Sequence, residues 1–220
     1  MQHHRILAWI GALLLVAIVM ILFFMSTRTP ERPAASLEQN LGTLNEPTVT
    51  FVDPARGPAN ASVTIVEFTD FTCSACASSA VNIARLQAEL PNDVKHVFKA
   101  MPNEGASSRA TDLAVAALCA GEQGSFWDFH DALFQVGNVD ALTDQDLVNL
   151  AEALELDLNA FASCFTEQET LALVERSFNE GLMLELTATP TIFINGERFT
   201  GAVDYDRLEG LVREMLLILD

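Results

Sequence analysis

The pattern of apolar and polar residues divides the chain into three parts. Every residue from 6 to 25 is apolar except Gly11, and a helix of about 20 such residues spans the ~30 Å hydrocarbon core of a bilayer. Residues 26–47 are rich in Pro, Ser, Thr, Glu and Asn, which is typical of a flexible tether. From residue 48 onward, short β-branched runs alternate with longer amphipathic segments. The pattern therefore predicts a membrane anchor, a tether and one folded domain.

We interpret residues 6–25 as an uncleaved transmembrane signal anchor that follows a short N-terminus, residues 1–5. The apolar run has no small-residue cleavage pattern at its end, and the nearest cluster of small residues is 34–36. The alternative is a long signal peptide cleaved within residues 26–36. The flanking charges leave the orientation open, because one arginine precedes the run and two follow it closely.

Four short runs of β-branched and aromatic residues predict strands. They are residues 63–68, 94–99, 191–194 and 197–200. The dipeptide Asn195-Gly196 between the last two is a strong hairpin signal. Helical spacing over 74–90 separates the first two strands, which predicts a parallel βαβ unit with a right-handed crossover. With a last amphipathic helix at 204–219, we expect an α/β fold whose mixed sheet carries helices on both faces.

The stretch between the second and third strands carries almost no strand signal and predicts a block of helices. The expected helices are residues 107–121, 125–136, 143–154, 158–165 and 166–184. Thr143, followed by two aspartates, is a good N-cap, and Gly121 is a plausible C-cap. This block is therefore predicted to be an insertion between strands of the layered α/β fold.

Charge and composition narrow the range of functions. The chain has 12 Lys and Arg against 30 Asp and Glu, a net charge of −18. So acidic a protein does not follow a phosphate backbone, which argues against a nucleic-acid partner. The composition also excludes collagen-like, coiled-coil and disordered classes.

The clearest chemical motif is Cys73-Ser74-Ala75-Cys76, directly after a predicted strand and at a helix start. A Cys-x-x-Cys beside a βαβ unit indicates a redox-active disulfide. Unpaired N–H groups at the helix N-terminus stabilise a thiolate, so Cys73 is the predicted attacking thiol and Cys76 the resolving thiol. The alternatives are an inert disulfide or half of a zinc site, which needs two further ligands. We expect no metal and no cofactor besides the cysteine pair.

The other two cysteines, Cys119 and Cys164, lie in separate predicted helices of the block. A disulfide between them is the preferred interpretation, and two buried free thiols are the alternative. Such a disulfide requires an oxidising compartment. Together with the Cys-x-x-Cys motif behind a membrane segment, it places the folded domain outside the cytoplasm.

Two further positions are candidate site residues. The pair Thr189-Pro190 precedes the strand 191–194, and a cis bond there would present the Thr189 backbone to a partner chain, whereas a trans proline would only end the preceding helix. Glu67 lies inside an apolar strand. A carboxyl buried there could exchange protons with Cys76, unless it points to solvent at the strand end.

At this point the sequence resembles the DsbA-like branch of the thioredoxin superfamily, over roughly residues 48–219. The residues that carry the likeness are Val66-Glu67-Phe68, Phe71-Thr72-Cys73-Ser74-Ala75-Cys76, residues 126–134 (FWDFHDALF) and Thr189-Pro190-Thr191. The resemblance implies a thioredoxin-like domain formed by 48–106 and 185–220, with residues 107–184 as the helical insertion of that branch. It also implies that Cys73 is the nucleophile, Cys76 the resolving thiol, Pro190 a cis-proline and Glu67 a buried acid.

The resemblance raises the expectation of a Cys119–Cys164 disulfide, since some relatives carry one in the insertion. One departure concerns the dipeptide Ser74-Ala75, where strongly oxidising members have Pro-His. No imidazole is therefore present between the cysteines to stabilise the Cys73 thiolate. His130, inside the matching insertion helix, is expected to be a packing residue.

The predicted function is a membrane-anchored, extracytoplasmic thiol:disulfide oxidoreductase that forms disulfides in exported proteins. Its expected partners are unfolded or reduced exported proteins and a membrane redox partner that resets the cysteine pair, and it is expected to be a monomer in the periplasm or an equivalent space. The alternatives are a disulfide reductase or isomerase, a thiolate protein that delivers copper, and a docking module with a vestigial redox site. Isomerases of the dimeric kind need a dimerisation domain, for which only the tether is available.

Overall fold

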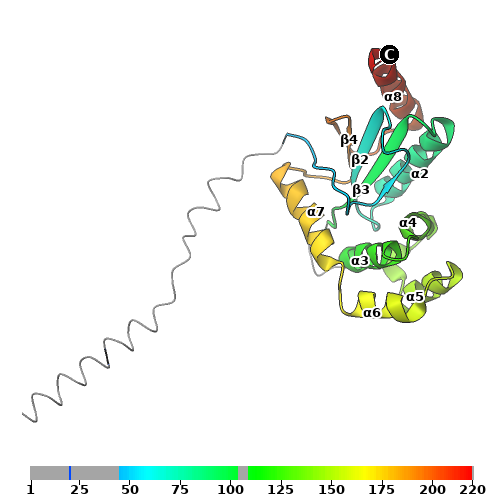
Figure 1. Cartoon of the computed structure of the whole chain (residues 1–220), viewed down its shortest axis with the longest axis vertical. Coiled ribbons are helices and arrows are strands. Elements are labelled where there is room, and N and C mark those ends of the chain that lie inside the picture. Colours follow the sequence, from blue (N-terminus) through cyan, green and yellow to red (C-terminus); the bar gives the residue numbers. More distant parts are fainter. Residues whose placement is uncertain (1–19, 21–44, 104–108, 220) are drawn as a thin grey trace, which may run out of the picture. The chain divides into compact units, whose positions relative to one another are not determined.

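The computed structural model describes Met20, residues 45–103 and residues 109–219 (Figure 1). The predicted membrane segment 6–25, apart from Met20, and most of the tether lie outside the described residues. Within the described part of the chain, no helix is long and apolar enough to cross a membrane.

A mixed sheet of five strands forms the centre of the folded domain. The strands are β1 (Ala55–Arg56), β2 (Val63–Thr69), β3 (Val94–Ala100), β4 (Thr191–Ile194) and β5 (Glu197–Thr200). Their order is β1-β3-β2-β4-β5, in which β2 and β3 are parallel and the other pairs are antiparallel. The mixed sheet predicted from the sequence is therefore confirmed. Strand β1 was not predicted, because a strand of two residues is too short to give a recognisable pattern.

Helices surround the sheet or form the block beside it (Figure 1). They are α2 (Ser74–Glu89), α3 (Arg109–Gly121), α4 (Phe126–Gln135), the 3-10 helix η3 (Val139–Ala141), α5 (Asp144–Ala153), α6 (Leu158–Thr166), α7 (Leu171–Met183) and α8 (Tyr205–Leu219). Thr143 caps α5 as predicted, because its hydroxyl accepts the N–H of Asp146 and its own N–H binds the Asp146 carboxylate.

The last helix of the block starts five residues later than predicted. The expected helix over 166–184 begins at Leu171 because α6 continues to Thr166 and a turn follows it. In that turn Gln168 has a positive φ of 55°. The hydroxyl of Thr170 then donates to the Val115 carbonyl at 3.2 Å, which fixes the start of α7 against α3.

Alternation along the strands gives the sheet two buried faces, because successive side chains point to opposite sides. One face packs against α2 and α8, through Val63, Ile65, Ile83, Val94, Ile192, Leu208 and Val212. The other face, with Val66, Phe68, Val97 and Phe193, packs against the end of α7 through Phe178 and Leu184. The predicted helices on both faces are thus present, and α7 supplies the second one.

A third apolar cluster fills the helical block and reaches the sheet. It contains most of α3 together with Phe129, Leu147, Phe161 and Val174. Phe71 and Phe98 belong to the same cluster, and their rings stack with centroids 5.6 Å apart. The segment just before the Cys-x-x-Cys motif is therefore held between the sheet and the block.

Candidate active site

Cys73 and Cys76 lie at the N-terminus of α2, both as free thiols. Cys73 is the N-cap residue, and its sulfur accepts the backbone N–H of Cys76 at an N···S distance of 3.2 Å. The Cys73 side chain is partly exposed, whereas Cys76 is fully buried one turn along the helix. Only the first sulfur can be reached by another protein.

Local interactions separate the acidities of the two thiols. The hydrogen bond from the Cys76 side chain, helped by the Cys76 backbone N–H, lowers the pKa of Cys73 to about 6. Burial, and then the same shared hydrogen bond, raise the pKa of Cys76 far above the ordinary thiol value. Because the thiolate is the nucleophile, Cys73 is poised to attack near neutral pH and Cys76 is not.

The Thr189–Pro190 peptide bond is cis in the structure. Cys73 and Thr189 are in contact across the site, since the Cys73 thiol donates to the Thr189 carbonyl at 3.5 Å. The structure thus brings together the cysteine motif and the proline segment that the sequence singled out. The part that each residue plays in exchange stays a prediction.

Asp70 links the two segments and was not found by sequence reasoning. One of its carboxylate oxygens accepts the backbone N–H and the hydroxyl of Thr72, both at 2.8 Å. The other accepts the backbone and side-chain N–H groups of Asn103 at 2.8 and 2.9 Å, and the Asn103 amide also donates to the Thr189 hydroxyl at 2.9 Å. This network sets the cysteine turn against the proline segment. The sequence did contain a signal for this role, because an aspartate two residues before Thr72 can accept hydrogen bonds in the turn that leads into the helix.

Glu67 is fully buried, so the alternative in which it points to solvent is wrong. Its carboxyl lies 3.0 Å from the Nε2 atom of His96 on the neighbouring strand, and that imidazole is fully buried as well. Burial raises the pKa of Glu67 to about 7 and holds the pKa of His96 well below its ordinary value. With a pKa of about 7, the Glu67 carboxyl exists in both its protonated and its ionised form near neutral pH, whereas the His96 imidazole is uncharged.

His130 is buried on α4, as expected for a packing residue. Its ring lies edge-on to those of Phe71 and Phe134, at centroid distances of 5.6 and 4.9 Å. It is also hydrogen-bonded, because its Nδ1 atom lies 2.8 Å from a carboxylate oxygen of Asp131. His130 is therefore both a packing residue and a hydrogen-bonding partner of Asp131.

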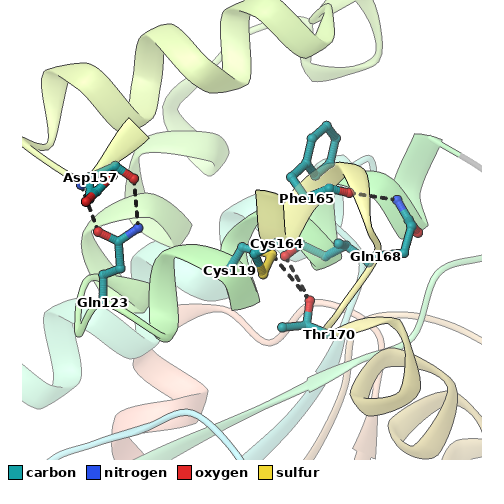
Figure 2. Close-up of a disulfide and its surroundings, with 8 residues drawn as sticks. Cys119, Gln123, Asp157, Cys164, Phe165, Gln168 and Thr170 are labelled. Atoms are coloured by element: carbon teal, nitrogen blue, oxygen red, sulfur yellow. Dashed lines mark hydrogen bonds between the residues drawn. A yellow bond between two sulfur atoms is a disulfide. The ribbon is translucent and has the colours of Figure 1, made fainter. Parts of the chain in front are cut away.

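The structure contains the expected disulfide between Cys119 and Cys164, which joins α3 to α6 (Figure 2). Gln123 and Asp157 brace the same two helices, since each makes a hydrogen bond to the other, at 2.8 and 3.2 Å. The disulfide lies in the core of the helical block, and it is separate from the Cys73–Cys76 motif.

No group of three or more His, Cys, Asp or Glu side chains in the described part of the chain is arranged to hold a metal ion. The chemistry that the site offers is that of a nucleophilic thiol with a buried partner thiol and a buried acid.

Comparisons with known proteins give a consistent result. A family model described as thioredoxin matches residues 50–214. The solved structure of oxidised BdbD from Bacillus subtilis is similar, with a TM-score of 0.68 and 24% identity over 78% of this chain and 96% of that one. The thiol-disulfide exchange protein alpha-DsbA2 from Wolbachia pipientis has a TM-score of 0.64 and 21% identity, over 82% of this chain and 92% of that one.

Among curated proteins, the chain is similar to part of the Na(+)/H(+) antiporter NhaA 3 of Salinispora tropica. The two are 32% identical over 160 residues, which is 73% of this chain and 24% of the antiporter. The antiporter NhaA of Herminiimonas arsenicoxydans is 31% identical over 161 residues, 73% of this chain and 25% of its own length. The chain thus spans about a quarter of these relatives.

Proposed function

The chain belongs to the thioredoxin family, and from that premise we propose that it is a DsbA-like oxidoreductase that forms disulfides in exported proteins through the Cys73–Cys76 pair. The proposal rests above all on the unequal cysteines. Cys73 is partly exposed and has a lowered pKa, whereas Cys76 is buried and has a raised one. This inequality suits a two-step exchange in which the first thiol meets the substrate and the second resolves the mixed disulfide.

The acidity of Cys73 supports an oxidising direction of moderate strength. A stabilised thiolate favours the reduced form of the pair, which makes the disulfide a better oxidant. Family members with a thiol pKa of about 7 and about 3.5 have potentials of about −270 and −120 mV. The Cys73 pKa of about 6 lies between these two cases. The absence of an imidazole at Ser74-Ala75 agrees with an intermediate value.

Substrate binding is proposed to use the Thr189 backbone. Its carbonyl lies beside the Cys73 sulfur and can pair with the main chain of an extended polypeptide. Recognition through main-chain groups is independent of sequence, which suits a catalyst that acts on many reduced, unfolded exported proteins.

The proposed setting is a membrane-anchored, monomeric protein whose folded domain lies in the periplasm or an equivalent extracytoplasmic space. The apolar residues 6–25 would be the anchor, and a membrane redox partner would reoxidise the cysteine pair. The Cys119–Cys164 disulfide supports this location, because such bonds persist in oxidising compartments. The curated relatives are named as Na(+)/H(+) antiporters, but this chain matches only about a quarter of their length. We therefore do not include ion transport in the proposed function.

Disulfide transfer to a reduced dithiol peptide tests this function. Oxidised protein is mixed with the peptide, and we expect the peptide to lose two thiols while Cys73 and Cys76 each gain a hydrogen. The matched control is protein that has been reduced mildly and alkylated at Cys73, with the Cys119–Cys164 disulfide intact, and it should transfer nothing. Equal loss of peptide thiols in both samples, or in neither, contradicts the proposal.

A further inference from the structure

The buried Cys76 thiol cannot exchange its proton with solvent directly, unlike the partly exposed Cys73 thiol. The Cys76 side chain is fully buried, and its raised pKa means that the sulfur carries a proton in the reduced protein. That proton must leave when the Cys73–Cys76 bond forms and must return when it breaks. A route between this sulfur and the solvent is therefore required.

The first part of the route runs along one face of β2. Thr69 is the last residue of β2, four residues before Cys73, and its buried hydroxyl has no hydrogen-bond partner within the described part of the chain. Glu67 lies two residues before Thr69 and hence on the same face of the strand. The Glu67 carboxyl then contacts Nε2 of His96 at 3.0 Å.

The second part runs from β3 to the surface of α4. The rings of His96 and His130 are T-shaped with centroids 6.4 Å apart, and Trp127 packs against both of them. Nδ1 of His130 binds Asp131 at 2.8 Å, and the Asp131 side chain is 41% exposed. Arg56 of β1 holds that carboxylate from the other side at 2.9 Å.

Unpaired polar atoms gather at the middle of this route. Oε1 of Glu67, Nδ1 of His96 and Nε2 of His130 are buried and have no hydrogen-bond partner within the described part of the chain. Each such atom destabilises the folded state, because it has lost its hydrogen bond to water and gained none in the protein. Apolar side chains would fill the same space at lower cost, so a purely structural role does not account for three of them.

We propose that His96, His130 and Asp131 extend the path from Glu67 to the surface and carry protons between solvent and the Cys76 thiol. The inference rests on the proposed redox function and adds the groups beyond the buried acid. Arg56 of β1 is a cation beside the cluster, because its guanidinium binds Asp131 and lies over the Trp127 ring at 4.3 Å from the centroid. Together with His130 it keeps Asp131 ionised at rest, so a proton that the carboxylate accepts from His130 is released readily to water.

The path serves the step in which Cys76 resolves a mixed disulfide. The Cys76 sulfur attacks Cys73, the Cys73–Cys76 bond forms, and the bond from Cys73 to the substrate sulfur breaks. The substrate sulfur leaves with the electron pair as a thiolate. The Cys76 proton passes to the Glu67 carboxylate, and from there through the histidines to Asp131 and water. In the reverse direction the same groups bring a proton to the departing Cys76 thiolate.

The variant His130→Phe tests the path, because it keeps an aromatic ring and removes the titrating group. Resolution of a mixed disulfide between Cys73 and a peptide is followed by stopped flow from pH 5 to 9. We expect resolution to slow about tenfold at neutral pH and its pH profile to change, since proton transfer by a placed group contributes at least this much. The alkylation rate of Cys73, which needs no proton from Cys76, should be unchanged.

Two further variants make the result decisive. Phe134→Leu disturbs the packing around the His130 ring without removing a titrating group, and it should keep the wild-type pH profile. Asp131→Asn removes the half-exposed carboxylate at the end of the path, together with its ion pair to Arg56, and should slow resolution if His130→Phe does not fold. Wild-type rates and pH profiles in Asp131→Asn and in folded His130→Phe overturn the proposal, as does an equal change in Phe134→Leu. Failure of the wild type to resolve mixed disulfides would instead contradict the proposed function.

Discussion

Replacing Cys73 with alanine is expected to abolish thiol–disulfide exchange. Cys73 carries the partly exposed sulfur of the pair and has a pKa lowered to about 6, so its thiolate is the proposed nucleophile that reaches a substrate. Cys76 cannot substitute for it, because that sulfur is fully buried and has a raised pKa. The measurement is disulfide transfer to the reduced peptide, with circular dichroism to show that the variant is folded.

Cys76→Ala is the matched counterpart and should give the opposite kind of defect. The variant keeps the attacking thiolate but has no thiol to resolve the mixed disulfide, so covalent adducts with disulfide-containing substrates should accumulate. Non-reducing electrophoresis and mass spectrometry would detect them. Exchange that survives in Cys73→Ala, or adducts that form through Cys76, would show that the roles are reversed.

Replacing both Cys119 and Cys164 with alanine should lower the free energy of unfolding by about 4 kcal/mol, because the disulfide closes a loop with a sequence separation of 45 residues. The disulfide joins α3 to α6 within the core of the helical block and takes no part in the proposed exchange. Urea unfolding measures the loss, and peptide oxidation measured on the same sample should persist. Complete loss of oxidation in a folded variant would indicate that the second pair relays electrons.

Local signals in the sequence predicted much of this architecture. The strands at 191–194 and 197–200 have the bounds expected from their β-branched and aromatic residues and from the Asn195-Gly196 turn. The Cys-x-x-Cys motif lies at a helix start, as predicted from the change from a β-branched run to helical spacing on either side of it. These features depend on residues that are adjacent in the sequence, so they can be predicted from the sequence alone.

The partners of the buried polar groups could not be predicted in the same way. The run 94–99 indicates a strand, but the contact of His96 with Glu67 depends on the register, in which His96 lies opposite Ile65. Lys99 on the other face is buried between Asp53 and Glu180, at 3.0 and 2.9 Å. Register and the packing of α7 bring such groups together, and no periodicity in the sequence encodes either of them.

The network around Asp70 shows the same limit at the candidate site. It joins the turn before Cys73, the segment after β3 and the residue before Pro190, which are far apart in the chain. Each segment carries an ordinary turn signal when it is considered alone. Their convergence follows from the βαβ unit and the antiparallel pairing of β4 with β2, which place all three at one end of the sheet.

The equilibrium reduction potential of the Cys73–Cys76 pair tests the central claim most directly. The protein is equilibrated in glutathione buffers of graded ratio, and the fraction of oxidised pair is measured by alkylation and mass spectrometry, with Cys119–Cys164 followed in the same spectra. A Cys73 pKa of about 6 predicts a potential between about −270 and −120 mV. A potential below about −300 mV, the range of inert structural disulfides, would contradict the account.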